Sequence, residues 1–381
     1  MSTNKRSKMK IVHLTTVHHP YDPRIFYKQC QSLKEAGFDV TLIAQALENG
    51  DLVEGDVKHI PLKKHTSRLK RMLFSPFELY KKAKKEKADI YVFHDPELLF
   101  VGSLLKKRDN IVVYDIHEDY VTSILQKQYL HPFIRQLAAK SYRFIEKLTT
   151  RKMALSLAEK YYQDIYPNGK CILNYPIIPE VDLQIDDSNV RKDALLYTGN
   201  VTEDRGALYH AKIPTIDEKV DVQLIGKCPQ MLANQMYAIA QDHKERLHIK
   251  GIDAFIPKYE IDAAYQETKW LAGIAIFPPT EHYMKKELTK FFEYMANGLP
   301  IICSNFPVWE AFIEQYECGL TVDPEDDQSI HDAINYLREH EKERQQMSLN
   351  GMKAVNEELN WRKEAEKLIN WYEQLIKERD K

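Results

Sequence analysis

Short apolar runs alternate with amphipathic stretches in the first part of the chain. Four runs have the length and β-branched content of buried strands: Lys10–Leu14, Val40–Ala44, Ile90–Phe93 and Asn110–Tyr114. Apolar residues recur at helical spacing in three stretches between them: Ile25–Ala36, Pro76–Glu86 and Glu97–Lys107. Strands separated by helices of this length predict βαβ units and a parallel sheet.

The alternation begins again after a further helical stretch, Pro132–Leu148, and a break at Asn174-Tyr175-Pro176, where the residue before proline avoids helix. The later predicted strands are Leu195–Tyr197, Asp221–Ile225, Leu247–Lys250, Ala272–Phe277 and Ile301–Ser304. The later predicted helices are Met231–Asp242, Ile261–Glu267, Glu287–Asn297, Asp327–His340 and Trp361–Lys377. Two successive α/β sheets predict two Rossmann-like domains with a cleft between them, where ligands bind beyond the carboxyl ends of the strands.

Composition supports a two-domain globular protein and indicates neither a metal site nor a set of disulfide bonds. The chain has 381 residues, of which 44% are hydrophobic and 29% charged. Its five cysteines are scattered and lack paired spacing, which favours reduced thiols and argues against a zinc site. No apolar run approaches the roughly 18–20 residues of a membrane span, and the basic N-terminus lacks a signal peptide. A cytoplasmic protein with no metal and no nucleic-acid partner is therefore expected.

Charge is distributed unequally along the chain. Met1–Lys152 holds 28 Lys and Arg against 17 Asp and Glu, whereas the remainder holds 26 against 39. The basic part favours an anionic membrane surface or a phosphate-bearing acceptor as a partner. Within it, Lys63–Lys87 mixes lysines and arginines with Leu, Met and Phe, as in segments that lie on an anionic leaflet. The alternative is a solvated helix face with an apolar core side, and Ser75-Pro76 predicts a break in any single long helix.

The segment Glu287–Ser304 has the most specific pattern in the chain. It enters a helix, stops at Asn297-Gly298 and continues into a buried strand. Thr289 and Lys290 are therefore predicted at a helix N-terminus, where unpaired amides and the helix dipole favour an anion such as a diphosphate. Glu293 lies one turn further along, within reach of a ribose. An ordinary αβ unit with a solvated Glu293 is the alternative interpretation.

This segment resembles the donor-binding motif of family 4 glycosyltransferases, which often reads Pro-Thr-Lys-Leu-Phe-Glu-Tyr-Met-Ala-Ala-Gly-Leu-Pro-Val-Ile. The resemblance implies that Glu293 binds the nucleotide ribose and that the helix start at Thr289–Lys290 approaches the diphosphate. One position differs, because the first glutamate of the family's usual pair, which contacts the donor sugar, falls at Lys285. Glu281 or Glu287 could replace it if the loop is shifted.

A second match lies at Leu196–Gly206, where a predicted strand ends at Gly199 before a polar turn. It resembles the family's Gly-Arg-Leu-x-x-x-Lys-Gly loop, whose two cations neutralise the departing diphosphate. Arg205 falls on the lysine position and keeps the charge, whereas Asn200 falls on the arginine position and loses it. A surface ion pair of Arg205 with Glu203 or Asp204 is the alternative.

Two segments of the first half carry further candidate residues. In the segment Val112–Tyr120, a buried strand delivers His117 to its carboxyl end, where family members carry a histidine that contacts the donor sugar and helps to organise the reaction centre. A histidine that only caps the strand end is the alternative. The preceding strand ends in His94-Asp95-Pro96-Glu97, which resembles the family's His-x-His/Asp motif and is interpreted as structural support.

The loop after the first strand, His18–Phe26, resembles a variant found in bacterial cell-surface polysaccharide transferases. On this resemblance Arg24 is a candidate contact to an acceptor or phosphate, with Asp22 and His18 beside it. A helix-start Arg24 paired with Asp22 is the alternative. His18-His19 lacks partners at metal-ligand spacing.

Taken together, the resemblance implies the GT-B fold: an acceptor domain over residues 1–175, a donor domain over 176–358 and a helix over 359–381 that crosses back. It implies metal-independent transfer of a sugar, with retention, from a nucleotide-diphosphate sugar to a glycan or lipid-linked acceptor in cell-surface polysaccharide or glycolipid assembly. UDP is expected rather than GDP, with no cofactor, and the protein is expected at the inner face of the plasma membrane. A sugar-nucleotide 2-epimerase of the same fold and a non-catalytic partner subunit are the alternatives.

Overall fold

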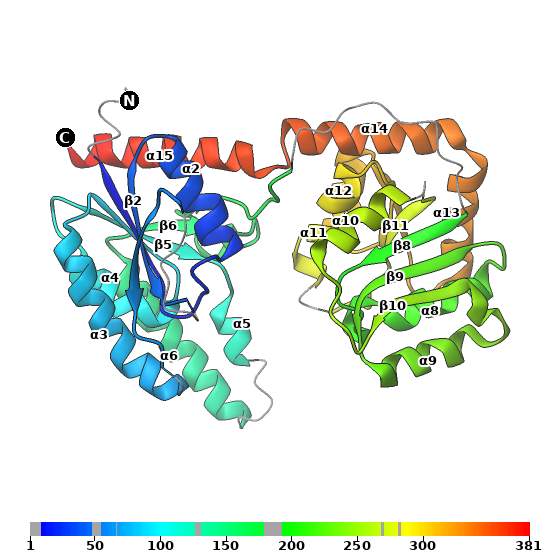
Figure 1. Ribbon diagram of the computed structural model, residues 1–381, viewed down its shortest axis with the longest axis horizontal. Coiled ribbons are helices and arrows are strands. Elements are labelled where there is room, and N and C mark those ends of the chain that lie inside the picture. Colours follow the sequence, from blue (N-terminus) through cyan, green and yellow to red (C-terminus); the bar gives the residue numbers. More distant parts are fainter. Residues whose placement is uncertain are drawn as a thin grey trace. The chain divides into compact units, whose positions relative to one another are not determined.

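Two parallel sheets organise the chain, and each belongs to its own unit (Figure 1). The computed structural model describes residues 9–47, 55–65, 67–125, 131–178, 193–267, 270–280 and 283–381. The first unit comprises Met1–Asn174 together with Trp361–Lys381, and the second comprises Tyr175–Asn360. The chain therefore leaves the first unit once and returns to it with its last helix.

The first unit has a seven-stranded sheet in the order β3-β2-β1-β4-β5-β6-β7, and all the pairings are parallel. Its strands are β1 (Lys10–Leu14), β2 (Asp39–Gln45), β3 (Lys58–Leu62), β4 (Ile90–Phe93), β5 (Ile111–Ile116), β6 (Ala154–Leu157) and β7 (Lys170–Cys171). The strand order reverses between β1 and β4, which makes their carboxyl ends the ligand-binding position of such a sheet.

Helices cover both faces of this sheet. They are η1 (Pro23–Cys30, with π-type hydrogen bonding), α2 (Gln31–Glu35), α3 (Arg68–Glu86), η2 (Pro96–Leu98), α4 (Leu99–Leu105), α5 (Tyr120–Leu125), α6 (Pro132–Thr150), α7 (Tyr162–Ile165) and α15 (Trp361–Arg379). Alternate strand residues face opposite sides: Ile11 packs in the core beneath η1, α2 and α15, whereas Val12 packs in the core beneath α3 and α4.

The last helix completes the first of these cores. Its buried residues Leu368, Tyr372 and Ile376 belong to the same cluster as Ile11 of β1. At its start, the indole nitrogen of Trp361 donates hydrogen bonds to the Lys28 carbonyl at 3.2 Å and to Ser32 Oγ at 2.9 Å. α15 is therefore part of the first unit although it follows the whole second unit in sequence.

The second unit has a six-stranded parallel sheet in the order β10-β9-β8-β11-β12-β13. Its strands are β8 (Ala194–Thr198), β9 (Asp221–Cys228), β10 (Leu247–Ile252), β11 (Ala272–Ala275), β12 (Ile301–Ser304) and β13 (Gly319–Val322). Its helices are η3 (Glu203–Arg205), α8 (Ala207–Ile216), α9 (Gln230–Ala240), η4 (Gln241–Arg246), α10 (Lys258–Glu267), η5 (Tyr283–Lys285), α11 (Thr289–Ala296), α12 (Pro307–Tyr316), α13 (Asp327–Glu339) and α14 (Glu341–Glu357). Here the order reverses between β8 and β11.

The predicted break at Ser75-Pro76 is wrong, because α3 runs without interruption from Arg68 to Glu86. A proline inside a helix removes one backbone hydrogen bond and costs about 3 kcal/mol. Leu79 and Ala83, just beyond it, are fully buried in the core under α3, and this packing outweighs the loss. Among the described helices, none combines the length and apolar character needed to cross a bilayer.

Candidate functional site

Polar side chains converge at the carboxyl ends of β1, β4 and β5 in the first unit. His13 lies in β1, His94 directly follows β4, Asp115 lies in β5 and His117 directly follows it. His13, His94 and Asp115 are at most 3% exposed, and the side chain of His117 is 13% exposed. The sheet order brings these residues together, since β1 lies next to β4 and β4 next to β5.

Asp115 is the centre of this cluster. Its carboxylate accepts two hydrogen bonds from Arg24, at 3.0 Å from Nε and 2.7 Å from Nη2, and others from Gln29 at 2.7 Å and Ser156 at 2.6 Å. Burial alone would raise the pKa of this carboxyl, but the Arg24 guanidinium and the imidazole of His117 hold the pKa well below its usual range. Asp115 is therefore a buried anion that is compensated on every side.

The same carboxylate orients the catalytic candidate. His117 Nε2 lies 2.6 Å from Asp115 Oδ2. Because an ionised carboxylate only accepts hydrogen bonds, we assign the ring hydrogen to Nε2, which leaves Nδ1 of His117 as an acceptor. The Tyr162 hydroxyl also fixes this residue by donating to the His117 carbonyl at 3.0 Å.

His94 and His13 continue the chain of hydrogen bonds from Asp115. His94 Nδ1 lies 3.2 Å from Asp115 Oδ2, and His94 Nε2 lies 3.0 Å from Nδ1 of His13. Burial lowers the pKa of His94 to about 4, against the opposing effect of Asp115. A neutral His94 that donates from Nδ1 to Asp115 can accept from His13 at Nε2, so the chain of hydrogen bonds is consistent. His94 thus has the structural role predicted for it.

The side-chain atoms of His94, Asp115 and His117 that could ligate a metal lie within 4.8 Å of one another. The Asp115 oxygens, however, already accept hydrogen bonds from three other side chains, among them the Arg24 guanidinium. A divalent cation would have to displace those donors and lie beside a fixed positive charge. The cluster therefore fits a hydrogen-bonded histidine better than it fits a metal.

Asp95 fixes the loop that follows β1. It is 1% exposed and accepts hydrogen bonds from the Thr15 and Thr16 hydroxyls and from the Val17 amide. His18 in the same loop lies 3.4 Å from Asp95. The loop holds its shape through this carboxylate.

The three candidate acceptor contacts have structural partners. Asp22 caps η1 by accepting from the amides of Arg24 and Ile25 at 2.9 Å, and His18 Nδ1 lies 3.3 Å from it. Burial would lower the pKa of His18, but Asp22 and Asp95 outweigh it and raise the pKa. Arg24 is 4% exposed, and its guanidinium pairs with Asp115 and not with Asp22, the partner in the alternative interpretation. This geometry makes Arg24 a positioning residue and does not support a direct acceptor contact.

In the second unit, a buried cation lies at the carboxyl end of β8. Lys290 Nζ lies 4.8 Å from the ring centre of Tyr197 and is so close to Gly199 that a Cβ at that position would lie 2.7 Å from it. Gly199 has φ of 96°, a conformation that favours glycine. Burial lowers the pKa of Lys290 to about 8; Glu293 opposes this shift and Arg205 adds to it.

Arg205 lies beside this cation on the loop between β8 and α8. Its Nε donates to the Tyr283 hydroxyl at 3.2 Å, and that hydroxyl donates to Asp204 at 3.1 Å. Within the described residues Arg205 forms no ion pair with Glu203 or Asp204, so the alternative of a surface ion pair is not what the structure shows. The Arg205 guanidinium is held by the neutral Tyr283 hydroxyl, so its positive charge is available to a bound anion.

The next helix, α11, brings the other predicted donor residues to the same place. Its N-cap residue is Leu288, and no capping hydrogen bond from a described side chain is found there; Thr289, the first helical residue, is exposed. Glu293, one turn on, is half-buried and lies 3.5 Å from the hydroxyl of Tyr265, which in turn lies 2.8 Å from Thr198 Oγ1 at the end of β8. The predicted residues Gly199, Arg205, Lys290 and Glu293 are thus neighbours at one sheet edge.

The positions that depart from the family pattern lie around this group. Asn200 is exposed, and its carbonyl accepts a hydrogen bond from the Tyr197 hydroxyl at 2.9 Å. Lys285 is exposed in η5, and Glu287 accepts from Tyr175 at 3.1 Å. Glu281, a suggested substitute for the missing glutamate, lies outside the described residues.

Sequence reasoning missed the residues that hold the candidates in place. Asp115 lies in the segment that leads to His117, and a lone acid in an otherwise apolar strand was a usable signal that it is paired. Tyr265 and Tyr283, which contact Glu293 and Arg205, come from segments without a distinguishing pattern. Only the folded chain brings them to the site.

Two family models match the chain. The model described as Glycosyltransferase Family 4 matches residues 23–158, and the model described as Glycosyl transferases group 1 matches residues 255–354. The first range contains His117 and Asp115, and the second contains Lys290 and Glu293. No curated protein matches the chain in sequence.

Solved structures share the fold of nearly the whole chain. A glycosyltransferase from Rickettsia africae has a TM-score of 0.72 at 13% identity, covering 97% of this chain and 99% of that one. Sucrose-phosphate synthase from Thermosynechococcus elongatus has a TM-score of 0.69 at 16% identity, with the same coverage. Anabaena HepE in complex with UDP and glucose has a TM-score of 0.66 at 12% identity, covering 96% of this chain and 100% of that one. At these identities the likeness establishes the fold.

Proposed function

Since the chain is a GT-B glycosyltransferase that resembles family 4, we propose that it moves a sugar from a nucleotide-diphosphate sugar to an acceptor hydroxyl with retention and without a metal. The expected nucleotide is UDP rather than GDP, and no cofactor takes part. Two neighbours are described as HepE complexes with UDP and with UDP-glucose, which supports this choice of donor.

The observation that carries the proposal is the pair of cations at the end of β8. The Lys290 ammonium group fills the space that the missing side chain of Gly199 leaves, Arg205 acts electrostatically on Lys290, and Lys290 itself lies in the first turn of α11. A departing diphosphate develops negative charge, and fixed cations and amides stabilise that charge in place of a metal ion. Glu293, on the same side of α11 one turn later, is assigned to the ribose.

His117 is assigned to the reaction centre, in contact with the donor sugar as in relatives. Its Nε2 hydrogen is committed to Asp115, so Nδ1 accepts a hydrogen bond from a sugar hydroxyl. Retention is supported by the resemblance, because retaining relatives use the leaving phosphate as base and need no carboxylate nucleophile. The protein then contributes to the reaction by orienting the donor sugar and by stabilising the charge of the departing diphosphate.

Calorimetric titration with UDP and GDP in EDTA tests the donor site. We expect UDP to bind more tightly than GDP. Glu293→Ala should weaken UDP binding about 10- to 100-fold through the loss of hydrogen bonds to a charged group, while Glu339→Ala, at an exposed residue of α13, serves as the control. If neither nucleotide binds to folded protein, the transferase proposal fails and a non-catalytic subunit is left.

Hydrolysis of a nucleotide-sugar panel would then identify the donor sugar, and the anomeric coupling constant in the NMR spectrum of the product tests retention. An α-linked donor should give an α-linked product. An inverted product would overturn the assigned mechanism, and conversion of the donor to its C2 epimer without transfer would favour the epimerase.

We also assign the acceptor to an anionic membrane surface, at the inner face of the plasma membrane. Large apolar side chains on α3 face outward: Leu69, Leu73 and Phe77 are 72%, 71% and 62% exposed. They recur every four residues, and Leu79 and Ala83 form a separate, buried side of the same helix. Lys81 extends over the Phe77 ring at 4.2 Å. An exposed apolar stripe rimmed by lysines is typical of a membrane-binding surface.

Vesicle co-sedimentation tests this surface. Phosphatidylglycerol vesicles should bind the chain, phosphatidylcholine vesicles should bind it weakly, and added salt should release it. The double variant Leu73→Gln with Phe77→Gln should reduce binding about 10-fold or more. Met231→Gln with Phe255→Gln, which alters two exposed apolar residues of the second unit, is the matched control. Equal binding by all the variants would exclude α3 from the contact.

A further inference from the structure

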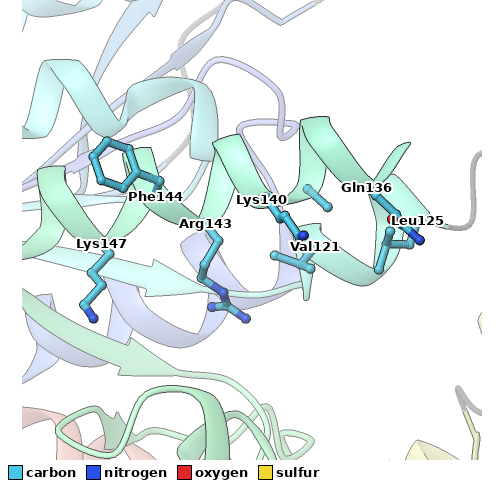
Figure 2. Close-up of a pocket in the computed structure, with 8 residues that line it drawn as sticks. Val121, Leu125, Gln136, Lys140, Arg143, Phe144 and Lys147 are labelled. Carbon is cyan, nitrogen blue, oxygen red and sulfur yellow. The ribbon is translucent and has the colours of Figure 1, made fainter. Parts of the chain in front are cut away.

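A groove lies between α5 and α6 of the first unit (Figure 2). Its volume is about 510 Å³, within the range of roughly 300–1,000 Å³ found for small-molecule sites. Its lining residues are Val121, Leu125, Gln136, Ala139, Lys140, Arg143, Phe144 and Lys147. We call it the α5–α6 groove. Four of its eight lining residues are apolar and three of the other four are cations, and the groove surface itself is formed almost entirely by carbon atoms.

The three cations, which we call the cationic rim, are Lys140, Arg143 and Lys147. They lie at intervals of three and four residues on one face of α6, and Figure 2 shows Arg143 and Lys147 reaching out from the same side of that helix. The acid of this helix, Glu146, is 2% exposed and accepts hydrogen bonds from Tyr142 and Tyr166 as well as lying 3.3 Å from Arg143. In the described part of the chain, Lys140 and Lys147 form no ion pair.

The groove starts close to the candidate catalytic histidine. Asp119 begins α5 by accepting hydrogen bonds from the amides of Val121 and Thr122 at 3.1 and 3.2 Å. Val121, the first groove residue, follows His117 by four residues. Four extended residues span at most about 14 Å, so the backbone at the start of the groove lies within that distance of His117.

We propose that the α5–α6 groove binds an amphiphile with an anionic headgroup, its alkyl chain along Val121 and Phe144 and its anionic group against the cationic rim. The inference rests on the proposed function in that this amphiphile is taken to be the acceptor, with the hydroxyl that receives the sugar on the headgroup. A water-soluble sugar phosphate would satisfy the rim but leave the apolar walls in contact with water. An uncharged lipid would leave Lys140 and Lys147 without a counter-charge among the described residues. An anionic amphiphile satisfies both.

Dodecyl phosphate, used as a monomer below its critical micelle concentration, is the probe for this site. Calorimetry should show saturable binding that is at least about 10-fold tighter than binding of octyl phosphate, because each buried methylene group adds to the affinity. Inorganic phosphate and dodecanol should each bind far more weakly. A diazirine-bearing alkyl phosphate should label peptides from α5 and α6. Labelling elsewhere, or equal affinity for inorganic phosphate, would overturn the proposal.

Charge variants test whether the cationic rim itself binds the anionic group of the amphiphile. Lys140→Glu with Lys147→Glu should weaken dodecyl phosphate binding at least about 10-fold, whereas Lys342→Glu with Lys353→Glu makes the same charge change on α14 of the second unit and should leave it unchanged. All four lysines are exposed, so folding should persist, as circular dichroism can verify. Equal losses in both variants would overturn the local site. UDP binding is measured separately. If the chain binds dodecyl phosphate but no nucleotide, the proposed transferase function is wrong, whereas the proposed binding site in the α5–α6 groove still stands.

Discussion

At the carboxyl end of the first sheet, charged groups neutralise one another, whereas at the carboxyl end of the second sheet two cations lack a carboxylate partner among the described residues. Asp115 accepts from Arg24, Gln29 and Ser156 while it orients His117. Lys290 and Arg205 instead have a tyrosine ring and a tyrosine hydroxyl as neighbours. The first arrangement fixes the His117 ring in one orientation, and the second retains positive charge for a ligand. The first unit thus supplies a fixed orientation of His117, and the second unit supplies positive charge for a ligand.

The largest expected effect comes from removing the anion of the first cluster. Asp115→Ala leaves the Arg24 guanidinium buried without its counter-charge, and such losses cost about 3–5 kcal/mol. Hydrogen exchange of β1 and β5 amides in increasing urea reports the stability of this unit. Asp164→Ala, at an exposed acid of the same unit, should cost less than about 0.5 kcal/mol. If the two variants are equally stable, Asp115 does not have the structural role assigned to it.

A smaller effect is expected from the cation of the second cluster. With a pKa of about 8, Lys290 is mostly protonated at pH 7 and loses its charge as the pH rises through that value. Affinity for UDP should therefore fall between about pH 7.5 and 9.5. Lys290→Met should bind UDP about 10-fold more weakly at pH 7 and show little further dependence on pH in this range. Calorimetry across the range measures both effects. Parallel pH profiles for the two proteins would exclude Lys290 from the donor contact.

The smallest effect tests whether the second cluster has room for more positive charge. Asn200→Arg restores the cation of the family pattern at an exposed position and should raise UDP affinity about 3-fold, in line with the modest strength of exposed ion pairs. Asn200→Gln changes length without charge and should have no such effect. A weaker affinity in the arginine variant would show that Asn200 is not directed toward the diphosphate.

The sequence predicted the sheets better than it predicted the contacts of the site. β1, β4 and β12 have the bounds that the apolar runs predicted, because strands that are buried on both faces consist mostly of apolar residues. β3, β6, β7 and β13 were missed, since they are short or carry polar residues. The extent of α3 was misjudged because a local rule about proline was outweighed by the burial of Leu79 and Ala83.

At the site, helix and strand ends could be predicted, but pairing could not. Lys290 and Glu293 follow from a helix start and one turn of spacing. The partner of Arg24 could not be predicted in this way: Asp22 is two residues away, yet the guanidinium reaches Asp115, which is 91 residues distant. Short-range spacing says nothing about which buried charges meet across a sheet. The roles of His117, Arg205 and Glu293 in the reaction remain predictions for the experiments above.

The position of α15 has a consequence for the order of synthesis. The helix supplies Trp361, Leu368, Tyr372 and Ile376 to the core beneath η1 and α2, yet it leaves the ribosome after all of the second unit. The first unit therefore exposes one apolar face of its sheet throughout translation of residues 175–360, while the second unit has its whole sequence available earlier. During synthesis the second unit should therefore finish folding before the first unit, which is the reverse of their order along the chain.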